Sequence, residues 1–150
     1  MNIEIQILTE KDTPELTSLI SVFEVVFEMD PFVYPDKKYL SGLLSNRSFI
    51  AVTARLNGKV IAGLTAYVLD QYYSTKPLAY IYDLAVLAEY QRQGVGRQLM
   101  DFFNSYCREK GFEEVFVQAD KEDDHAIDFY RSTQPTREDQ AVQFSYSVGS

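Results

Sequence analysis

The fold of this chain is decided by residues 82–100, which read YDLAVLAEYQRQGVGRQLM. The stretch begins as the end of a nearly continuous apolar run over 78–86, which is typical of a central strand and is interrupted only by Asp83. A short polar segment then leads into a Gly-x-Gly turn. Beyond that turn apolar residues recur at helical spacing, so the pattern predicts a helix over 94–110.

The glycine turn has the chemistry of an anion site. Gly94 and Gly96 lack Cβ atoms, so a ligand can approach the backbone, and the first N–H groups of the following helix have no internal partner. Such a helix end binds phosphate groups, and Arg92 and Arg97 add positive charge beside it. Two other interpretations stay open: a dinucleotide-binding turn with Asp120 as its ribose ligand, and glycines that only ease helix packing. A P-loop is excluded because no Gly-Lys-Ser/Thr is present.

The other elements follow from period and turn signals. We expect strands over 3–7, 48–55, 59–69, 115–119 and 142–146, and helices over 14–28, from Asp36 to about Leu44, and from Asp123 or Asp124. The two strands joined by Asn57-Gly58 carry the strongest short hairpin signal. The last strand is predicted from the alternation of Val142, Phe144 and Tyr146. This order predicts an α/β fold with a mixed central β-sheet flanked by helices, in a single domain over residues 1–150.

Composition and charge restrict the partners. The 150 residues are 46% hydrophobic and 24% charged, and no apolar run approaches the roughly 20 residues of a membrane span. A net charge of −8 repels nucleic acid and anionic membranes and attracts cations. The only cysteine, Cys107, and the only histidine, His125, support neither a disulfide nor a metal site. We expect a cytoplasmic protein with a cationic small-molecule partner, no metal, and no nucleic-acid or membrane partner.

Acidic residues gather in the C-terminal third. Seven carboxylates stand between Glu113 and Asp128, against Lys121 alone. Such a cluster is either a solvated acidic face or the lining of a cleft that binds a polycation.

Several segments resemble a known family. Gln91–Gly96 (QRQGVG) resembles the Gln/Arg-x-x-Gly-x-Gly/Ala signature of the GNAT acetyltransferase superfamily, and Asp123–Tyr130 (DDHAIDFY) resembles its second acetyl-CoA element. Further segments resemble the aminoglycoside 3-N-acetyltransferases of the GNAT type: 48–51, 66–69, 80–86, 116–120, 123–124 and 137–139. The chain departs from that group at Ser132–Pro135 and in its last strand, so the edge of the substrate site is expected to differ.

The resemblance implies a function and a cofactor. It implies transfer of an acetyl group from acetyl-CoA, held in a splayed cleft, directly to the 3-amino group of a gentamicin-type aminoglycoside in a ternary complex, which confers resistance. A homodimer is also implied. The implied cofactor-binding residues are Leu84, Ala85, Val86, Arg92, Gln93, Gly94, Val95, Gly96, Arg97 and Asp123.

Two residues are predicted to be catalytic. Asp83 is a carboxylate in an apolar strand, so it must face a cavity, water or a cation; it would bind the substrate ammonium and accept its proton, or else form an internal salt bridge. Tyr130 matches the residue that, in the family, protonates the leaving thiolate, because a phenol with a pKa near 10 is protonated at neutral pH. The alternative is a tyrosine packed on a helix face.

The acceptor would be held by further residues, mostly acidic. The predicted substrate-binding residues are Asp83, Tyr82, Asp120, Asp124, Glu138, Asp139 and Glu28. Asp123 or Asp124 could instead cap a helix.

Two alternatives to aminoglycoside acetylation stay open. The first is a GNAT enzyme that acetylates a polyamine or other small amine. The second is a non-catalytic module that senses acyl-CoA.

Overall fold

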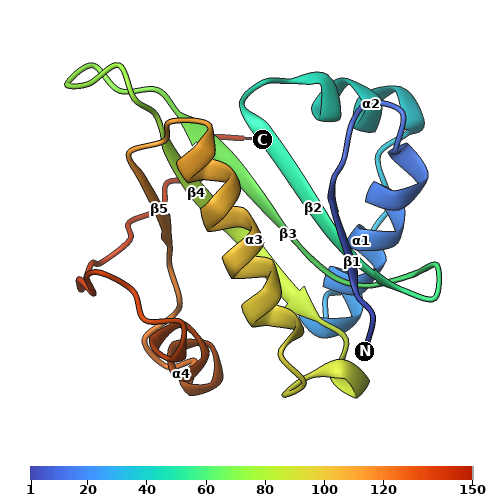
Figure 1. The fold of residues 1–150 in the computed structure, drawn as a ribbon. Helices are drawn as coiled ribbons and strands as arrows, with labels where there is room; N and C mark the ends of the chain where they lie inside the picture. Colours follow the sequence, from blue (N-terminus) through green and yellow to red (C-terminus); the bar gives the residue numbers. More distant parts are fainter. Residues whose placement is uncertain (150) are drawn as a thin grey trace. The chain divides into compact units, whose positions relative to one another are not determined.

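A five-stranded sheet forms the centre of the structure, a computed structural model that describes residues 1–149 (Figure 1). The strands follow chain order across the sheet; all neighbours are antiparallel except β4 and β5, which are parallel. The expected mixed α/β sheet is confirmed. The chain divides into two compact units, Met1–Gln118 and Ala119–Ser150. The first unit contains β1 (Glu4–Ile7), α1 (Thr13–Val26), α2 (Lys37–Ser45), β2 (Phe49–Leu56), β3 (Lys59–Leu69), β4 (Leu78–Val86), the short 3₁₀ helix η1 (Ala88–Tyr90), α3 (Val95–Glu109) and β5 (Glu114–Val117).

The β2–β3 hairpin forms at the predicted turn. Asn57 and Gly58 both have positive φ, at 52° and 80°, as the two central residues of a type I′ turn require. The backbone twist of this turn matches the right-handed twist of the strands that it joins. The hairpin therefore fixes the register of the longest strand, β3, and through it the register of β4.

Helices α1 and α2 pack on one face of this sheet and α3 on the other (Figure 1). On the α1 side Leu19 lies fully buried against Gly63 of β3. On the α3 side Leu99 and Phe103 are fully buried. Both faces of the central strands are therefore covered over part of their length, which explains why β2 and β3 are almost continuously apolar.

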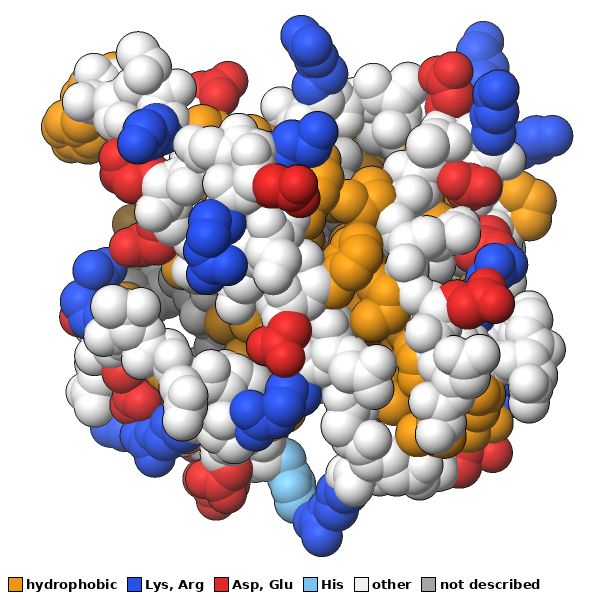
Figure 2. Space-filling model, in the orientation of Figure 1, with side chains coloured by type: hydrophobic (Ala, Val, Ile, Leu, Met, Phe, Trp, Pro, Cys, Tyr) orange, Lys and Arg blue, Asp and Glu red, His pale blue; other side chains and the backbone are white. Residues whose placement is uncertain are grey.

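The surface around α3 mixes charges of both signs with apolar side chains. Figure 2 shows Lys, Arg, Asp and Glu side chains interspersed, and an apolar strip between α3 and β1. No helix among residues 1–149 has the length and apolar character needed to cross a membrane.

In the second unit, helix α4 (Asp124–Ser132) begins where the sequence predicts, and Asp123 accepts a hydrogen bond from the Ala126 N–H at 3.1 Å. The predicted last strand over 142–146 is wrong. Residues 134–149 form no strand, and the alternating side chains of Val142, Phe144 and Tyr146 are exposed. Alternation shows that a segment can pair, but a strand also needs a neighbour, and the described residues from 119 onward contain none.

The tight contact at Gly63 gives a stability prediction. A Cβ added there would meet a methyl group of Leu19 and lie about 2.5 Å from the carbonyl oxygen of Val52, which the sheet cannot move. Gly63→Ala should therefore lower the free energy of unfolding by about 1–3 kcal/mol, the usual cost of overpacking, as measured by urea denaturation. Gly42→Ala is the matched control: it lies exposed in α2 with no atom within 4 Å of the added Cβ, and should be neutral or stabilising. Equal stability of the two variants would contradict the packing described.

Candidate active site

The second half of β4 has one edge without a neighbouring strand. Strand β5 accompanies β4 only from Leu78 to Ile81, so within Met1–Gln118 no strand lies beside Tyr82–Val86 on that edge. On its other edge β4 stays paired with β3 as far as Val86. The backbone of Leu84, Ala85 and Val86 therefore borders an unpaired edge, where an extended ligand can bind as an added strand does.

A β-bulge directs Asp83. Ala66 of β3 pairs with Ile81, but the next residue towards the N-terminus, Thr65, pairs with Asp83, so Tyr82 is the extra residue. Asp83 consequently lies on the same face as Thr65 and Ala85. That face is the one covered by α1, because Ala85 belongs to the core cluster that contains Leu19.

Asp83 is half-buried, and burial raises the pKa of its carboxyl above the ordinary value. Among residues 1–149 its side chain forms neither a hydrogen bond nor an ion pair, so the internal salt bridge that the sequence left open is not present there. An unpaired, partly desolvated carboxylate attracts a cation strongly, and its raised pKa makes it a better proton acceptor than a solvated one.

The loop after β4 ends at a helix N-terminus without a side-chain cap. Gly94 is the N-cap of α3 with φ 86°, a left-handed conformation that glycine adopts without strain. As a glycine, Gly94 offers no side chain to cap the first N–H groups of α3, which lie at the positive end of the helix dipole. A Cβ at Gly94 would meet no atom within 4 Å, so the approach is open.

Side chains of the same loop hold it in place. Gln91 donates to the Val86 carbonyl oxygen at 2.8 Å, and Gln93 donates to the Glu89 carbonyl oxygen at 3.0 Å. Arg92 is exposed in a left-handed conformation with φ 62°, which is unusual for a residue with a side chain, and Arg97 is also exposed. Val95 and Gly96 are buried in the first turn of α3.

The remaining predicted residues lie on several elements. Tyr130 of α4 is half-buried, and its ring meets Phe129 edge-on with centroids 5.0 Å apart. Asp120 and Asp124 are exposed, and Asp123 has the capping role that the sequence left open. Glu28 follows α1 and is exposed, with φ 50°.

Two of the predicted acidic residues have partners in the second unit. Glu138 forms a two-point ion pair with Arg131, at 2.9 and 2.8 Å, which lowers the pKa of Glu138. Asp139 pairs with Arg137 at 2.6 Å. The arginines therefore partly neutralise the negative charges of Glu138 and Asp139, whereas no cationic side chain among residues 1–149 pairs with Asp83.

Sequence reasoning missed the aromatic surroundings of Asp83. Tyr67 of β3 contacts Tyr82 edge-on, with centroids 5.7 Å apart, and its ring also meets Phe49. Burial, the neighbouring phenols of Tyr82 and Tyr39, and the Asp83 carboxylate together raise the pKa of Tyr67. The signal that could have indicated this neighbour is the register of the β2–β3 hairpin, which sets Tyr67 opposite Phe49.

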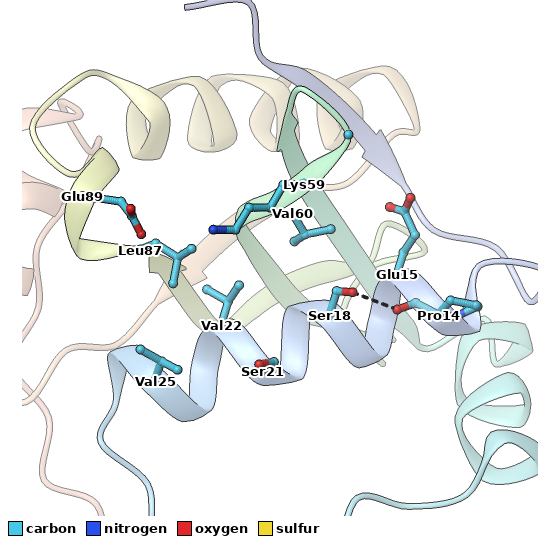
Figure 3. A pocket seen from close by; sticks show the side chains of 11 residues that line it. Pro14, Glu15, Ser18, Ser21, Val22, Val25, Lys59, Val60, Leu87 and Glu89 are labelled. Atoms are coloured by element: carbon cyan, nitrogen blue, oxygen red, sulfur yellow. Dashed lines mark hydrogen bonds between the residues drawn. The ribbon is translucent and has the colours of Figure 1, made fainter.

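Other polar features do not add to this site. Burial raises the pKa of the Cys107 thiol to about 11, so the thiolate nucleophile is not available at neutral pH. The described residues contain no group of three His, Cys, Asp or Glu that could hold a metal ion. A groove of about 750 Å³ lies between α1 and the β2–β3 turn and extends to the start of the loop after β4; Figure 3 shows Lys59 extending across it towards Leu87 and Glu89.

The site therefore combines an unpaired strand edge, the N-terminus of α3 and a carboxylate at a β-bulge. The chain matches the acetyltransferase (GNAT) family over residues 14–133 and belongs to it. Members of this family use acetyl-CoA as the acetyl donor. The sequence-based assignment to the GNAT superfamily is therefore confirmed.

Among solved structures, the chain is similar to an aminoglycoside acetyltransferase, meta-AAC0020, from an uncultured soil metagenomic sample, in complexes with trehalose and with sisomicin. Identity is 54%, the TM-score is 0.96, and the match covers 98% of this chain and 97% of that one. A second aminoglycoside acetyltransferase from such a sample, HMB0005, is 30% identical with a TM-score of 0.92, over 99% of this chain and 100% of that one. AAC(6')-Iy, bound to a bisubstrate analogue, shares the fold at 14% identity and a TM-score of 0.78, over 98% and 99% of the two chains. The comparison with curated proteins found no match.

The raised pKa of Asp83 makes a prediction about stability and pH. Because the folded pKa exceeds the unfolded one, the ionised carboxylate opposes folding above about pH 3.9, and the loss grows as the pH rises through the folded pKa. Asp83→Asn removes that penalty. Its free energy of unfolding should exceed that of the native protein at pH 7, and the difference should shrink as the pH falls.

Urea denaturation at a series of pH values measures this difference. Asp101→Asn, an exposed position on α3, controls for the general loss of one negative charge. A less stable Asp83→Asn protein at neutral pH would mean that a favourable partner holds the native carboxylate.

Proposed function

We propose that this protein transfers the acetyl group of acetyl-CoA to an amino group of an aminoglycoside antibiotic, and that the acceptor is the 3-amino group of gentamicin-type drugs. The observation that carries the proposal is the 54% identity, over 98% of this chain, to an aminoglycoside acetyltransferase whose structure contains sisomicin. Acetylation converts an ammonium into a neutral amide. The drug loses a charge that it needs to bind ribosomal RNA, so the reaction confers resistance.

The cofactor is assigned to the open edge of β4 and the N-terminus of α3. Acetyl-CoA supplies a thioester, whose acyl group is activated towards amines, and an anionic pyrophosphate. We assign the pyrophosphate to the backbone amides of residues 93–97, with Arg92 and Arg97 as the cationic side chains beside them. The backbone of Leu84 and Val86 is assigned to the pantetheine arm and the thioester, with the Leu84 N–H at the developing oxyanion. Asp123, which caps α4, completes the proposed cofactor set.

Asp83 is assigned to the acceptor amine. Its unpaired carboxylate attracts the ammonium, and its raised pKa favours removal of a proton, directly or through a water molecule. The neutral amine can then attack the thioester carbonyl. Because the thiol of Cys107 stays protonated, direct transfer within a ternary complex of donor and acceptor is the simplest route.

Further contacts to the drug are assigned to Tyr82, Asp120, Asp124 and Glu28. The carboxylates of Asp120, Asp124 and Glu28 are exposed, so each of these three contributes modestly. Glu138 and Asp139 belong to the same proposed set, but arginines already pair with them, so we expect weaker contributions from these two.

The substrate class is tested by release of free thiol from acetyl-CoA. The acceptors are gentamicin, sisomicin, kanamycin, spermidine and a histone-tail peptide. We expect turnover with gentamicin and sisomicin and weak activity with spermidine, and NMR of the product to show acetylation of the 3-amino group. Turnover with spermidine alone would identify a polyamine acetyltransferase. Binding of acetyl-CoA without turnover of any acceptor would indicate a sensor of acyl-CoA.

Tyr130 is proposed as the acid that protonates the leaving thiolate. Tyr130→Phe removes the phenolic proton and keeps the ring against Phe129, so kcat should fall by roughly 10²-fold with little change in the KM for acetyl-CoA. Tyr106→Phe is the matched control, because this α3 tyrosine stacks on Phe103 and has no proposed catalytic role. Full kcat in Tyr130→Phe would leave the tyrosine as a packing residue.

A further inference from the structure

A continuous row of aromatic rings crosses four strands of the sheet. Strand pairing sets Phe49 of β2 opposite Tyr67, Tyr67 opposite Tyr80 of β4, and Tyr80 opposite Phe116 of β5. Directly paired residues project from the same face of a sheet. The Phe49 and Tyr67 rings are 5.5 Å apart between centroids, and the Tyr80 and Phe116 rings stack at 4.8 Å.

The bulge adds Tyr82 to this row. Its ring meets Tyr67 at 5.7 Å and 90° and Tyr80 at 6.1 Å and 82°, so it joins the two halves of the row. Asp83, the next residue, pairs with Thr65, which is two positions from Tyr67 along β3 and hence on the same face. An unpaired carboxylate therefore lies beside the middle of the aromatic row.

The row is anchored on its β2 side and at Tyr80, and it is open between these two points. Phe49 is buried, and the hydroxyl of Tyr80 donates to the Gln118 side chain at 2.9 Å. Tyr82 is 59% exposed and Tyr67 is 37% exposed, and among the described residues neither hydroxyl forms a hydrogen bond. A ring that only stabilised the sheet would gain more from being covered, so the exposed middle of the row points to a ligand.

The chemistry of this surface suits a ring that carries ammonium groups. The face of a phenol ring is negative, so it attracts cations and the slightly positive C–H groups of an apolar sugar face. An aminosugar offers both at once: a flat C–H face, and ammonium groups at its rim. A linear polyamine offers charge without a ring, so Asp83 can attract it while the aromatic surface gains little.

We propose that Tyr67 and Tyr82 form a stacking surface in which one ring stacks on the C–H face of an aminosugar ring of the acceptor, beside Asp83, while the other ring, at 90° to it, borders the edge of that sugar. This surface thereby selects ring-shaped amines over linear ones. The inference rests on the proposed function and names residues that determine its specificity. Asp83 supplies the charge recognition and the two tyrosines supply the shape recognition.

The experiment compares two acceptors with acetyl-CoA at saturation, sisomicin as the aminosugar and spermidine as the linear amine. Tyr67→Leu and Tyr82→Leu keep apolar bulk and remove the aromatic face. In each we expect the ratio of kcat/KM for sisomicin to kcat/KM for spermidine to fall by about tenfold, mainly through a higher KM for sisomicin. Tyr67→Phe and Tyr82→Phe keep the ring and should retain most of this ratio.

Tyr73→Leu is the matched control, since Tyr73 is 81% exposed on the β3–β4 loop and lies outside the row. It should leave the ratio unchanged. Urea denaturation of every variant separates specificity from stability: a row that only packs would lower stability and reduce both activities in proportion.

The outcomes separate this inference from the proposed function. If the native protein acetylates sisomicin and the Leu variants keep the native ratio, the stacking surface is refuted and the function stands. If the native protein prefers spermidine, both are refuted. A fall in the ratio limited to the Leu variants supports the inference.

Discussion

The β-bulge at Tyr82 is the constraint on which the rest of the site depends. In a regular strand Asp83 would share a face with Ile81, because alternate residues project to the same side. Ile81 is fully buried on the face that α3 covers, so a regular β4 would direct a carboxylate into the core on that face. One extra residue reverses the alternation and pairs Asp83 with Thr65 on the opposite face. Leu84 then returns to the side of Leu64, so β4 keeps its apolar packing on both sides of the bulge.

The other edge of β4 also changes at the bulge. Pairing with β5 ends at Ile81, the last residue before the bulge, and the strand continues for five more residues with that edge open. A half-buried carboxylate and an unpaired backbone edge both cost stability, and here they occur together in one strand. The neighbouring core offsets the cost: Leu19, Leu64 and Ile81 are fully buried around β3 and β4. Stability is supplied next to the site rather than within it, as is common for functional sites.

Much of the fold and part of the site could be predicted from the sequence. Asn57-Gly58 specified its hairpin through local φ preferences, and Gly94 specified the start of α3 in the same way. Asp83 could be predicted as a site residue because a charged side chain within an apolar strand is visible in the sequence of that one segment. Tyr67 was missed because its role depends on its neighbours in β2 and β4, and the register between strands is not written in any one of them. The predicted last strand was wrong for the converse reason: its alternation is present, but the described residues from 119 onward contain no strand that could pair with it.

The proposed reaction brings an anionic donor and a cationic acceptor to a protein whose net charge is −8. Binding both requires two local fields of opposite sign that do not cancel. In the proposed assignment β4 keeps these fields apart. Asp83 lies at the bulge, and the uncapped amides of α3 begin beyond the end of the strand, with Arg92 and Arg97 beside them. From Asp83 to the end of β4 at Val86 the backbone extends about 10 Å, similar to the distance over which physiological salt screens charge. Salt therefore weakens the field of each subsite at the position of the other. The open edge between the two subsites lets the reacting groups meet.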